Sequence, residues 1–179
     1  MARSPGARDL AAGALACAGA ATLVIVCGAA SVALTGLADD VRRALRFDFA
    51  GVDETPAAAL QIALHNARLA AAALLCALVV PRLAQRARLL ADVVLATVLA
   101  ANASLVGLAL GAYGGRVAAA IALHLPIEFA ALSLAGGAYM STSRRPLGLA
   151  DLAIVAGLCA LMLIIAATLE TYVALGGGG

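Results

Sequence analysis

Charge is what this sequence lacks most. Only 12% of its 179 residues are charged, about half the fraction found in an average soluble domain, whereas 64% are hydrophobic. The mean hydropathy is +1.04. The uncharged runs are longer than the core helices of a soluble protein need, and runs of this length are typical of membrane-spanning helices. The composition therefore excludes a soluble globular protein and predicts an all-α, polytopic membrane helical bundle in the lipid bilayer.

Lysine and paired cysteines are also missing. All twelve basic residues are arginines, spread over loops with a net charge of +2, whereas nucleic-acid binding needs a concentrated basic face; we expect no nucleic-acid partner. The four cysteines lie inside apolar runs without a CxxC motif, so we interpret them as small buried residues. We predict no metal site and no cofactor. The longest polar stretch, about 38–55, leaves no room for a separate soluble domain.

Apolar segments of spanning length are what the sequence does contain. We interpret residues 1–179 as one integral membrane domain, with an extracytoplasmic loop over 38–55 and a flexible tail at 176–179. The first segment is longer than the apolar part of a signal peptide and is interpreted as an uncleaved span; cleavage near Ala38 is the alternative. Five transmembrane spans are predicted, over 12–36, 57–80, 93–112, 117–140 and 151–174.

The loops and span ends carry two further signals. Residues 41–49 form either a short interfacial helix or a solvated loop. Thr55 followed by Pro56 predicts the capped start of the second span.

The arginines predict the orientation. Five spans place the termini on opposite sides, and arginines concentrate in cytoplasmic loops. We therefore expect a cytoplasmic N-terminus and an extracytoplasmic C-terminus. One side carries Arg3, Arg8, Arg82, Arg86, Arg88, Arg144 and Arg145, and the other carries Arg42, Arg43, Arg46 and Arg116, offset by five acids.

His124 and Glu128 form the most informative pair in the sequence. Glu128 is the only formal charge between Arg116 and Arg144, and the four-residue spacing stacks both side chains on one helix face. Ionisable groups inside a membrane usually face a protein interior or a cavity. Pro126, which lies between them, predicts a local kink or an opened carbonyl.

Other polar side chains fall in the same layer of the predicted bundle. With 1.5 Å of rise per residue, four spans contribute polar groups between the midplane and the outer third. Arg68 is the only cation at that depth and is the natural counter-ion of Glu128, or otherwise of Glu170. Asn66, Asn102 and His65 each have a structural alternative, as hydrogen-bonding groups between or within helices. For Arg68 paired with an acid, the structural alternative is a contact that only locks the packing of the helices. The predicted outward-opening pocket contains His65, Asn66, Arg68, Asn102, His124, Glu128 and Glu170.

Glycines recur every four residues at the end of the third span. Small residues with this spacing let another helix approach closely. Gly107, Gly111 and Gly115 are therefore predicted to pack the bundle or a homodimer.

The order of these residues resembles the stage II sporulation protein M family of small integral membrane proteins. The resemblance covers about residues 56–173 and departs from the family at Leu125, where the family usually has glycine. It implies a protein of the bacterial cytoplasmic membrane that recruits envelope hydrolases during sporulation engulfment or accompanies the maturation and export of circular bacteriocins. The family as a whole brings no settled enzymatic activity. The residues concerned are Asn66-x-Arg68, Asn102 before Gly107, His124-x-x-x-Glu128, Gly136-Gly137 and Glu170.

Two functional hypotheses remain open. The first is a non-enzymatic membrane component whose pocket binds an envelope hydrolase or a secreted peptide. The second is an intramembrane peptidase or peptide cyclase, in which Glu128 or Glu170 is the general base, His124 the acid or oxyanion donor, and Arg68 holds charge.

Two weaker alternatives complete the set. A zinc site of His65, His124 and Glu128 would lack a dense ligand motif. A transporter or proton-coupled component is disfavoured because the five spans show no inverted repeat.

Overall fold

Apolar runs rich in alanine and leucine, which favour helix, build every long element. The computed structural model describes residues 7–46, 54–142 and 147–173, and these residues form helices and short turns. The tail at 176–179 and three of the arginines used for orientation, at positions 3, 144 and 145, lie outside the described residues. In chain order the elements are α1 (Ala7–Thr35), α2 (Ala38–Leu45), α3 (Pro56–Val79), the 3-10 turn η1 (Val80–Arg82), α4 (Gln85–Tyr113), α5 (Gly115–Ile121), α6 (Leu125–Thr142) and α7 (Leu149–Tyr172).

Four of these helices, α1, α3, α4 and α7, are long and apolar enough to cross a membrane. The pair α5 and α6 makes a fifth crossing if it is counted as one broken span. A helix of 24 residues, such as α3 or α7, is about 36 Å long, which exceeds the roughly 30 Å hydrocarbon core. The prediction of a polytopic helical bundle with about five spans is confirmed, and the chain is a multi-pass membrane protein.

The helices extend beyond the predicted spans where polar residues do not interrupt helix formation. Predicted spans 57–80 and 151–174 agree with α3 and α7 to within two residues. In contrast, α4 begins at Gln85, well before the predicted start at 93, because its first turns carry exposed arginines that are good helix formers but not apolar. Hydropathy therefore marks the apolar part of α4 and not its beginning.

Thr55 and Pro56 start α3 as predicted. The Thr55 side chain accepts a hydrogen bond from the backbone N–H of Ala58 at 3.2 Å, and Pro56 occupies the first helical position. Proline is favoured there because its missing N–H would have no partner within the helix.

The predicted fourth span, 117–140, is not one continuous helix. It is divided into α5 and α6, which are bent by 67° at the break over residues 122–124. Pro126 explains the break, because it has no N–H for the Ala122 carbonyl and its ring crowds that carbonyl. The helix starts again at His124, whose carbonyl accepts hydrogen bonds from Ile127 (3.0 Å) and Glu128 (3.1 Å). The predicted kink beside Pro126 is thus confirmed.

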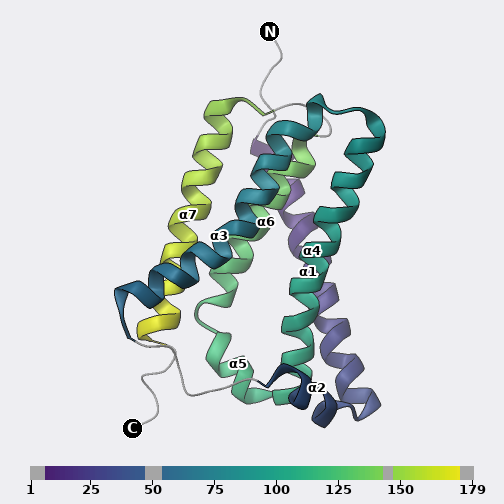
Figure 1. Cartoon of the computed structure of the whole chain (residues 1–179), viewed down its shortest axis with the longest axis vertical. Helices are drawn as coiled ribbons and strands as arrows, with labels where there is room; N and C mark the ends of the chain where they lie inside the picture. Colours follow the sequence, from purple (N-terminus) through teal and green to yellow (C-terminus); the bar gives the residue numbers. More distant parts are fainter. Residues whose placement is uncertain (1–6, 47–53, 143–146, 174–179) are drawn as a thin grey trace.

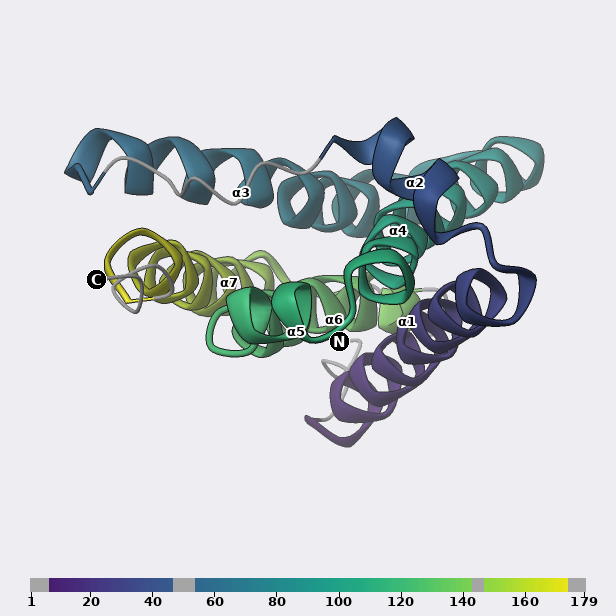
Figure 2. The same cartoon turned by 90° about the horizontal axis from the view of Figure 1, so that it is seen from below.

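Helix α6 lies at the centre of the bundle, where it packs against α1, α3 and α7 (Figure 2). Helix α1 also packs along α4, and α3 packs along α7. In contrast, α3 and α4 have few contacts although they are consecutive spans. Figure 1 shows that α1 starts at one end of the bundle, and that α2, α5 and the end of α7 lie at the other. The first and last spanning helices therefore run in the same direction, so that the start of α1 and the end of α7 lie at opposite ends of the bundle, as five spans require.

Glycines allow α1 to approach α4 closely. A Cβ atom on Gly107 would lie 3.0 Å from the Cα of Ile25, and one on Gly111 would lie 2.7 Å from the Ala29 carbonyl oxygen. A Cβ atom on Gly115 would meet nothing within 4 Å, because this residue starts α5 beyond the end of α4. The predicted ridge of three glycines is therefore two glycines long, and its partner is α1 of the same chain.

The other end of α1 packs against α6 in the same way. A Cβ atom on Gly13 would lie 2.8 Å from the Gly137 carbonyl oxygen, and one on Gly137 would lie 2.7 Å from the Cα of Ala14. Contact at van der Waals distance is the main source of helix association in lipid, so these glycines hold α1 against both α4 and α6.

Candidate functional site

A cavity of about 760 Å³ lies at the end of the bundle where α2 and α5 are found. Its walls come from α3, α4 and α6, together with the ends of α2, α5 and α7. Five of the polar residues predicted to share a pocket line this cavity, and Gln61 joins them. We call it the end pocket, and its polar lining consists of Gln61, His65, Asn66, His124, Glu128 and Glu170.

Glu128 lies in the first turn of α6 and is half-buried. Its Oε1 atom accepts a hydrogen bond from Nδ2 of Asn66, which is 62 residues earlier, on α3. An amide donor satisfies part of the carboxylate's hydrogen-bonding capacity but supplies no positive charge. Glu128 is therefore held in place by α3 without being neutralised by it.

His124 is the most buried polar residue of the end pocket. Its side chain is only 7% exposed, and Nδ1 has no hydrogen-bond partner among the described residues. His124 lies at the break between α5 and α6, where its carbonyl accepts the first hydrogen bonds of α6. Buried polar atoms are hydrogen-bonded in the great majority of cases, and leaving one unpaired costs about 1–3 kcal/mol. Nδ1 is thus a buried polar atom whose hydrogen-bonding capacity is not used by the described residues.

Glu170, near the end of α7, makes the pocket acidic. It is half-buried and close enough to both Glu128 and His124 to interact with them electrostatically. Among the residues that the structure describes, no arginine lines the end pocket, and the sequence contains no lysine. The pocket therefore combines two carboxylates with no basic side chain other than its two histidines, an arrangement that complements a cation or several N–H donors.

Arg68 does not serve as the counter-ion expected from its depth. It is exposed and forms no ion pair within residues 7–46, 54–142 and 147–173. The reason is helical geometry: Arg68 follows Asn66 by two residues, so the two side chains cannot point the same way. Asn66 points towards Glu128, and Arg68 does not line the end pocket.

Asn102 also lies outside the end pocket. Its Nδ2 donates to the Val98 carbonyl of its own helix at 2.9 Å, and the residue is exposed. It therefore makes no hydrogen bond to another helix among the described residues.

A second cavity, of about 630 Å³, lies between α1, α3, α4 and α6. Its lining is mainly apolar and includes Arg68 and Asn102. We call it the lateral cleft. It meets the end pocket at His65, Asn66 and Glu128, which line both cavities. The few contacts between α3 and α4 explain why space remains there.

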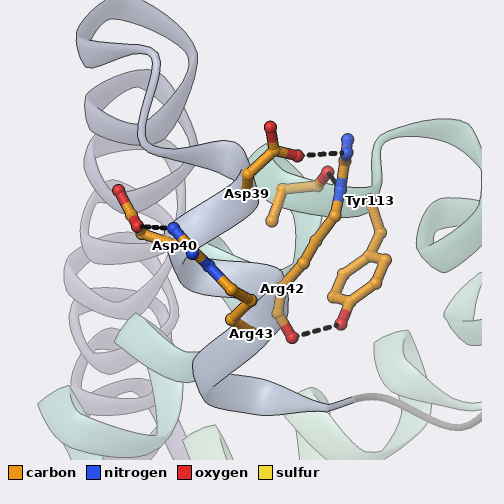
Figure 3. A network of polar contacts seen from close by, with 6 residues as sticks. Asp39, Asp40, Arg42, Arg43 and Tyr113 are labelled. Carbon is orange, nitrogen blue, oxygen red and sulfur yellow. Dashed lines mark hydrogen bonds and ion pairs between the residues drawn. The ribbon is translucent and has the colours of Figure 1, made fainter.

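Helix α2 is fastened across the end of α4 by Arg42, a contact that sequence reasoning missed (Figure 3). Arg42 Nε donates to the Ala112 carbonyl at 2.7 Å, while its Nη1 donates to Asp39 at 3.0 Å. The Tyr113 hydroxyl donates in turn to the Arg42 carbonyl at 3.3 Å. The last carbonyls of a helix have no partner inside it, so an arginine here stabilises the end of α4. Because Leu45 of α2 lines the end pocket, this contact fixes one of its walls.

The described residues contain no group of three His, Cys, Asp or Glu side chains placed to hold a metal ion. The zinc alternative that uses His65, His124 and Glu128 therefore gains no supporting geometry.

No protein-family model matches this chain, and neither a curated protein nor a solved structure matches it. The end pocket and the order of its residues are accordingly the features that indicate a function.

Proposed function

We propose that this membrane protein binds a secreted peptide or an envelope protein through the end pocket. The observation that carries the proposal is the convergence of His124, Glu128 and Glu170 at one end of a membrane-spanning bundle, without a cation in the lining. Intramembrane ionisable groups are costly unless they are paired or functional. A partner that supplies positive charge and hydrogen-bond donors offsets this cost.

We further propose that the end pocket opens on the extracytoplasmic side. The opposite end of the bundle carries Arg82, Arg86 and Arg88 around η1, all of them exposed. At the pocket end, Arg42 and Arg43 are each paired with an aspartate of α2. An excess of arginine marks cytoplasmic loops, which supports this orientation.

The chemistry of the lining favours a primary ammonium as the recognised group. A free peptide amino terminus or a lysine side chain donates three hydrogen bonds and carries the charge that Glu128 and Glu170 complement. About 760 Å³ lies within the range of small-molecule sites, so the pocket fits the terminal residues of a peptide and not a folded domain.

The resemblance to the stage II sporulation protein M family supplies a biological setting for this proposal. In that setting the partner is an envelope hydrolase recruited to the membrane or a circular bacteriocin during maturation and export. The genes that neighbour this one test the setting directly. A gene for an envelope hydrolase supports the first role, and a gene for a bacteriocin precursor supports the second.

The binding proposal is tested with purified protein in nanodiscs and two forms of one short apolar peptide. One form has a free amino terminus, and the other is acetylated, which removes the terminal charge. We expect the free form to bind more tightly, and Glu128→Gln and Glu170→Gln each to weaken its binding about 10- to 150-fold, as for a charged hydrogen bond of about 1.5–3 kcal/mol.

Asp151→Asn is the matched control, because it removes the same charge from the other end of α7, away from the pocket lining. Equal affinities for both peptides, or unchanged affinity in both glutamine variants, would refute the proposal. We also expect Glu128→Gln to lower the amount of assembled protein in membranes, because Asn66 then loses its charged acceptor.

An intramembrane peptidase or peptide cyclase is the second candidate. It is favoured by one observation: the unpartnered Nδ1 of buried His124 lies in the same pocket as two carboxylates. Glu128 or Glu170 would act as general base, and His124 would supply the acid or stabilise an oxyanion.

The two candidates are separated by mass spectrometry of candidate precursors incubated with the protein in nanodiscs. If Glu128→Gln stays abundant and binds the peptide normally but loses processing, catalysis is the function and the binding proposal is wrong. If no precursor is cleaved or joined, the catalytic candidate fails.

A further inference from the structure

Arg68 is a charged residue in the middle of a membrane-spanning helix. It is the thirteenth of the 24 residues of α3, so about 18 Å of helix separates it from the start and about 16 Å from the end. It is exposed and has no ion pair within the described part of the chain. A charged side chain at this depth is costly and usually has a partner of opposite charge.

The surroundings of Arg68 show where such a partner fits. Arg68 lines the lateral cleft, whose other walls come from α1, α4 and α6 and are mainly apolar. Cleft residues on α3 and α4 include Leu69, Ala72 and Leu99, with Asn102 as a second polar group. An apolar groove with one cation at mid-membrane complements an apolar helix with one acid at mid-membrane.

Glu128 does not supply this acid, although it also lines the cleft. Its carboxylate accepts a hydrogen bond from Asn66 and lies beyond ion-pair distance of Arg68. Lipid phosphates do not supply it either, because they lie at the membrane surface and arginine reaches them only from near helix ends.

The described acids of a second copy of the chain do not supply it either. Glu128 and Glu170 line the end pocket, and Glu170 is the third residue from the end of α7. Asp92 accepts a hydrogen bond from the Tyr139 hydroxyl. The remaining acids lie in α2 or near helix ends, namely Asp9, Asp39, Asp40, Glu54 and Asp151.

We propose that the lateral cleft is the docking site for a transmembrane helix of a different membrane protein, and that this helix carries an aspartate or glutamate opposite Arg68. The site is independent of the ligand of the end pocket. The two cavities meet at His65, Asn66 and Glu128, so the docked helix lies beside the pocket.

The proposal is tested by photo-crosslinking in phosphatidylcholine vesicles. The purified chain carries benzoylphenylalanine at Ala72 in the cleft or, as a control, at Ile154, which is 63% exposed on α7. The probes are three biotinylated leucine-alanine helices that differ only in a central Glu, Gln or Lys. Interhelical polar pairs contribute about 0.6–1.7 kcal/mol, so we expect the Glu helix to crosslink at Ala72 about 3- to 20-fold more than the Gln helix.

Two variants make the test specific for charge. Arg68→Gln is expected to abolish the preference for the Glu helix, and Arg68→Glu is expected to transfer it to the Lys helix. A transfer of preference also shows that the second variant is folded, since a misfolded cleft would prefer neither helix.

Three outcomes would overturn the proposal. They are equal crosslinking of the Glu and Gln helices at Ala72, the same preference at Ile154 as at Ala72, and crosslinking of Ala72 only to lipid. Crosslinking mainly between two copies of the chain would also overturn it and would assign the cleft to a homodimer.

Discussion

Replacing Gly107 with alanine is expected to separate α1 from α4. The new Cβ atom would lie 3.0 Å from the Cα of Ile25 and 3.1 Å from its carbonyl carbon, with the carbonyl oxygen closer still. These neighbours are backbone atoms, so no side-chain rotation relieves the contact and the helices must move apart. A gap of about 0.5–1 Å removes a quarter to a half of the dispersion energy of the atoms involved. We expect the free energy of unfolding to fall by about 1–3 kcal/mol, as for other overpacked sites.

Gly157→Ala is the matched control for this substitution. Gly157 lies within α7, and a Cβ atom there would meet nothing within 4 Å. Both substitutions gain the same helix propensity, about 0.5–1 kcal/mol, so the difference between the variants measures the contact with α1 alone.

The measurement is reversible unfolding by SDS in mixed micelles. Unfolding is monitored through maleimide labelling of Cys159, which is 2% exposed in the folded chain. The other three cysteines are replaced by alanine so that only Cys159 reacts. The reasoning is refuted if Gly107→Ala is as stable as Gly157→Ala, because α1 would then not pack against the α4 backbone.

Three further predictions follow from other contacts. Gly137→Ala is expected to lower the unfolding free energy more than Gly136→Ala, because the added Cβ meets backbone atoms of α1 in the first case and the movable Cys17 thiol in the second. An SDS titration that keeps Cys17, with labelling of Cys159 read from its own peptide by mass spectrometry, compares the two variants. Arg42→Gln is expected to speed hydrogen exchange in α2 at least several-fold while exchange in α7 is unchanged, since the contact with the Ala112 carbonyl joins α2 to α4 and does not involve α7. The proposed orientation predicts that a cysteine at the exposed Asp40 reacts with an impermeant maleimide in intact cells, whereas one at the exposed Arg86 reacts only after the membrane is permeabilised. The reverse result would show that the topology is inverted.

The spans were predictable because an apolar run of sufficient length has few alternatives to a membrane helix. The same local logic located the start of α3 at Thr55 and Pro56 and the bend beside Pro126. These features depend on neighbours in sequence, and no distant partner is needed to define them.

Features that depend on distant partners were not predictable. Depth alone placed Arg68 and Asn66 in one polar layer. Residues two positions apart on a helix point to different sides of it, however, so only Asn66 contacts Glu128. Similarly, the spacing of Gly115 matched that of Gly107, yet α4 ends before it. The Arg42 contact joins residues 70 positions apart, and nothing local in the sequence specifies Ala112 as its partner.

The hydrogen bond between Asn66 and Glu128 has a consequence for the biogenesis of this protein. Among the four single-helix spans, α3 has the lowest hydropathy, 1.8, against 2.2 for α1 and α4 and 2.7 for α7. Its polar acceptor on α6 is translated 62 residues later, which takes roughly 3–12 s at cellular elongation rates. During that interval the Asn66 amide on α3 lacks the carboxylate that it meets in the folded chain. We therefore expect stable release of α3 from the insertion machinery to be coupled to the synthesis of α6.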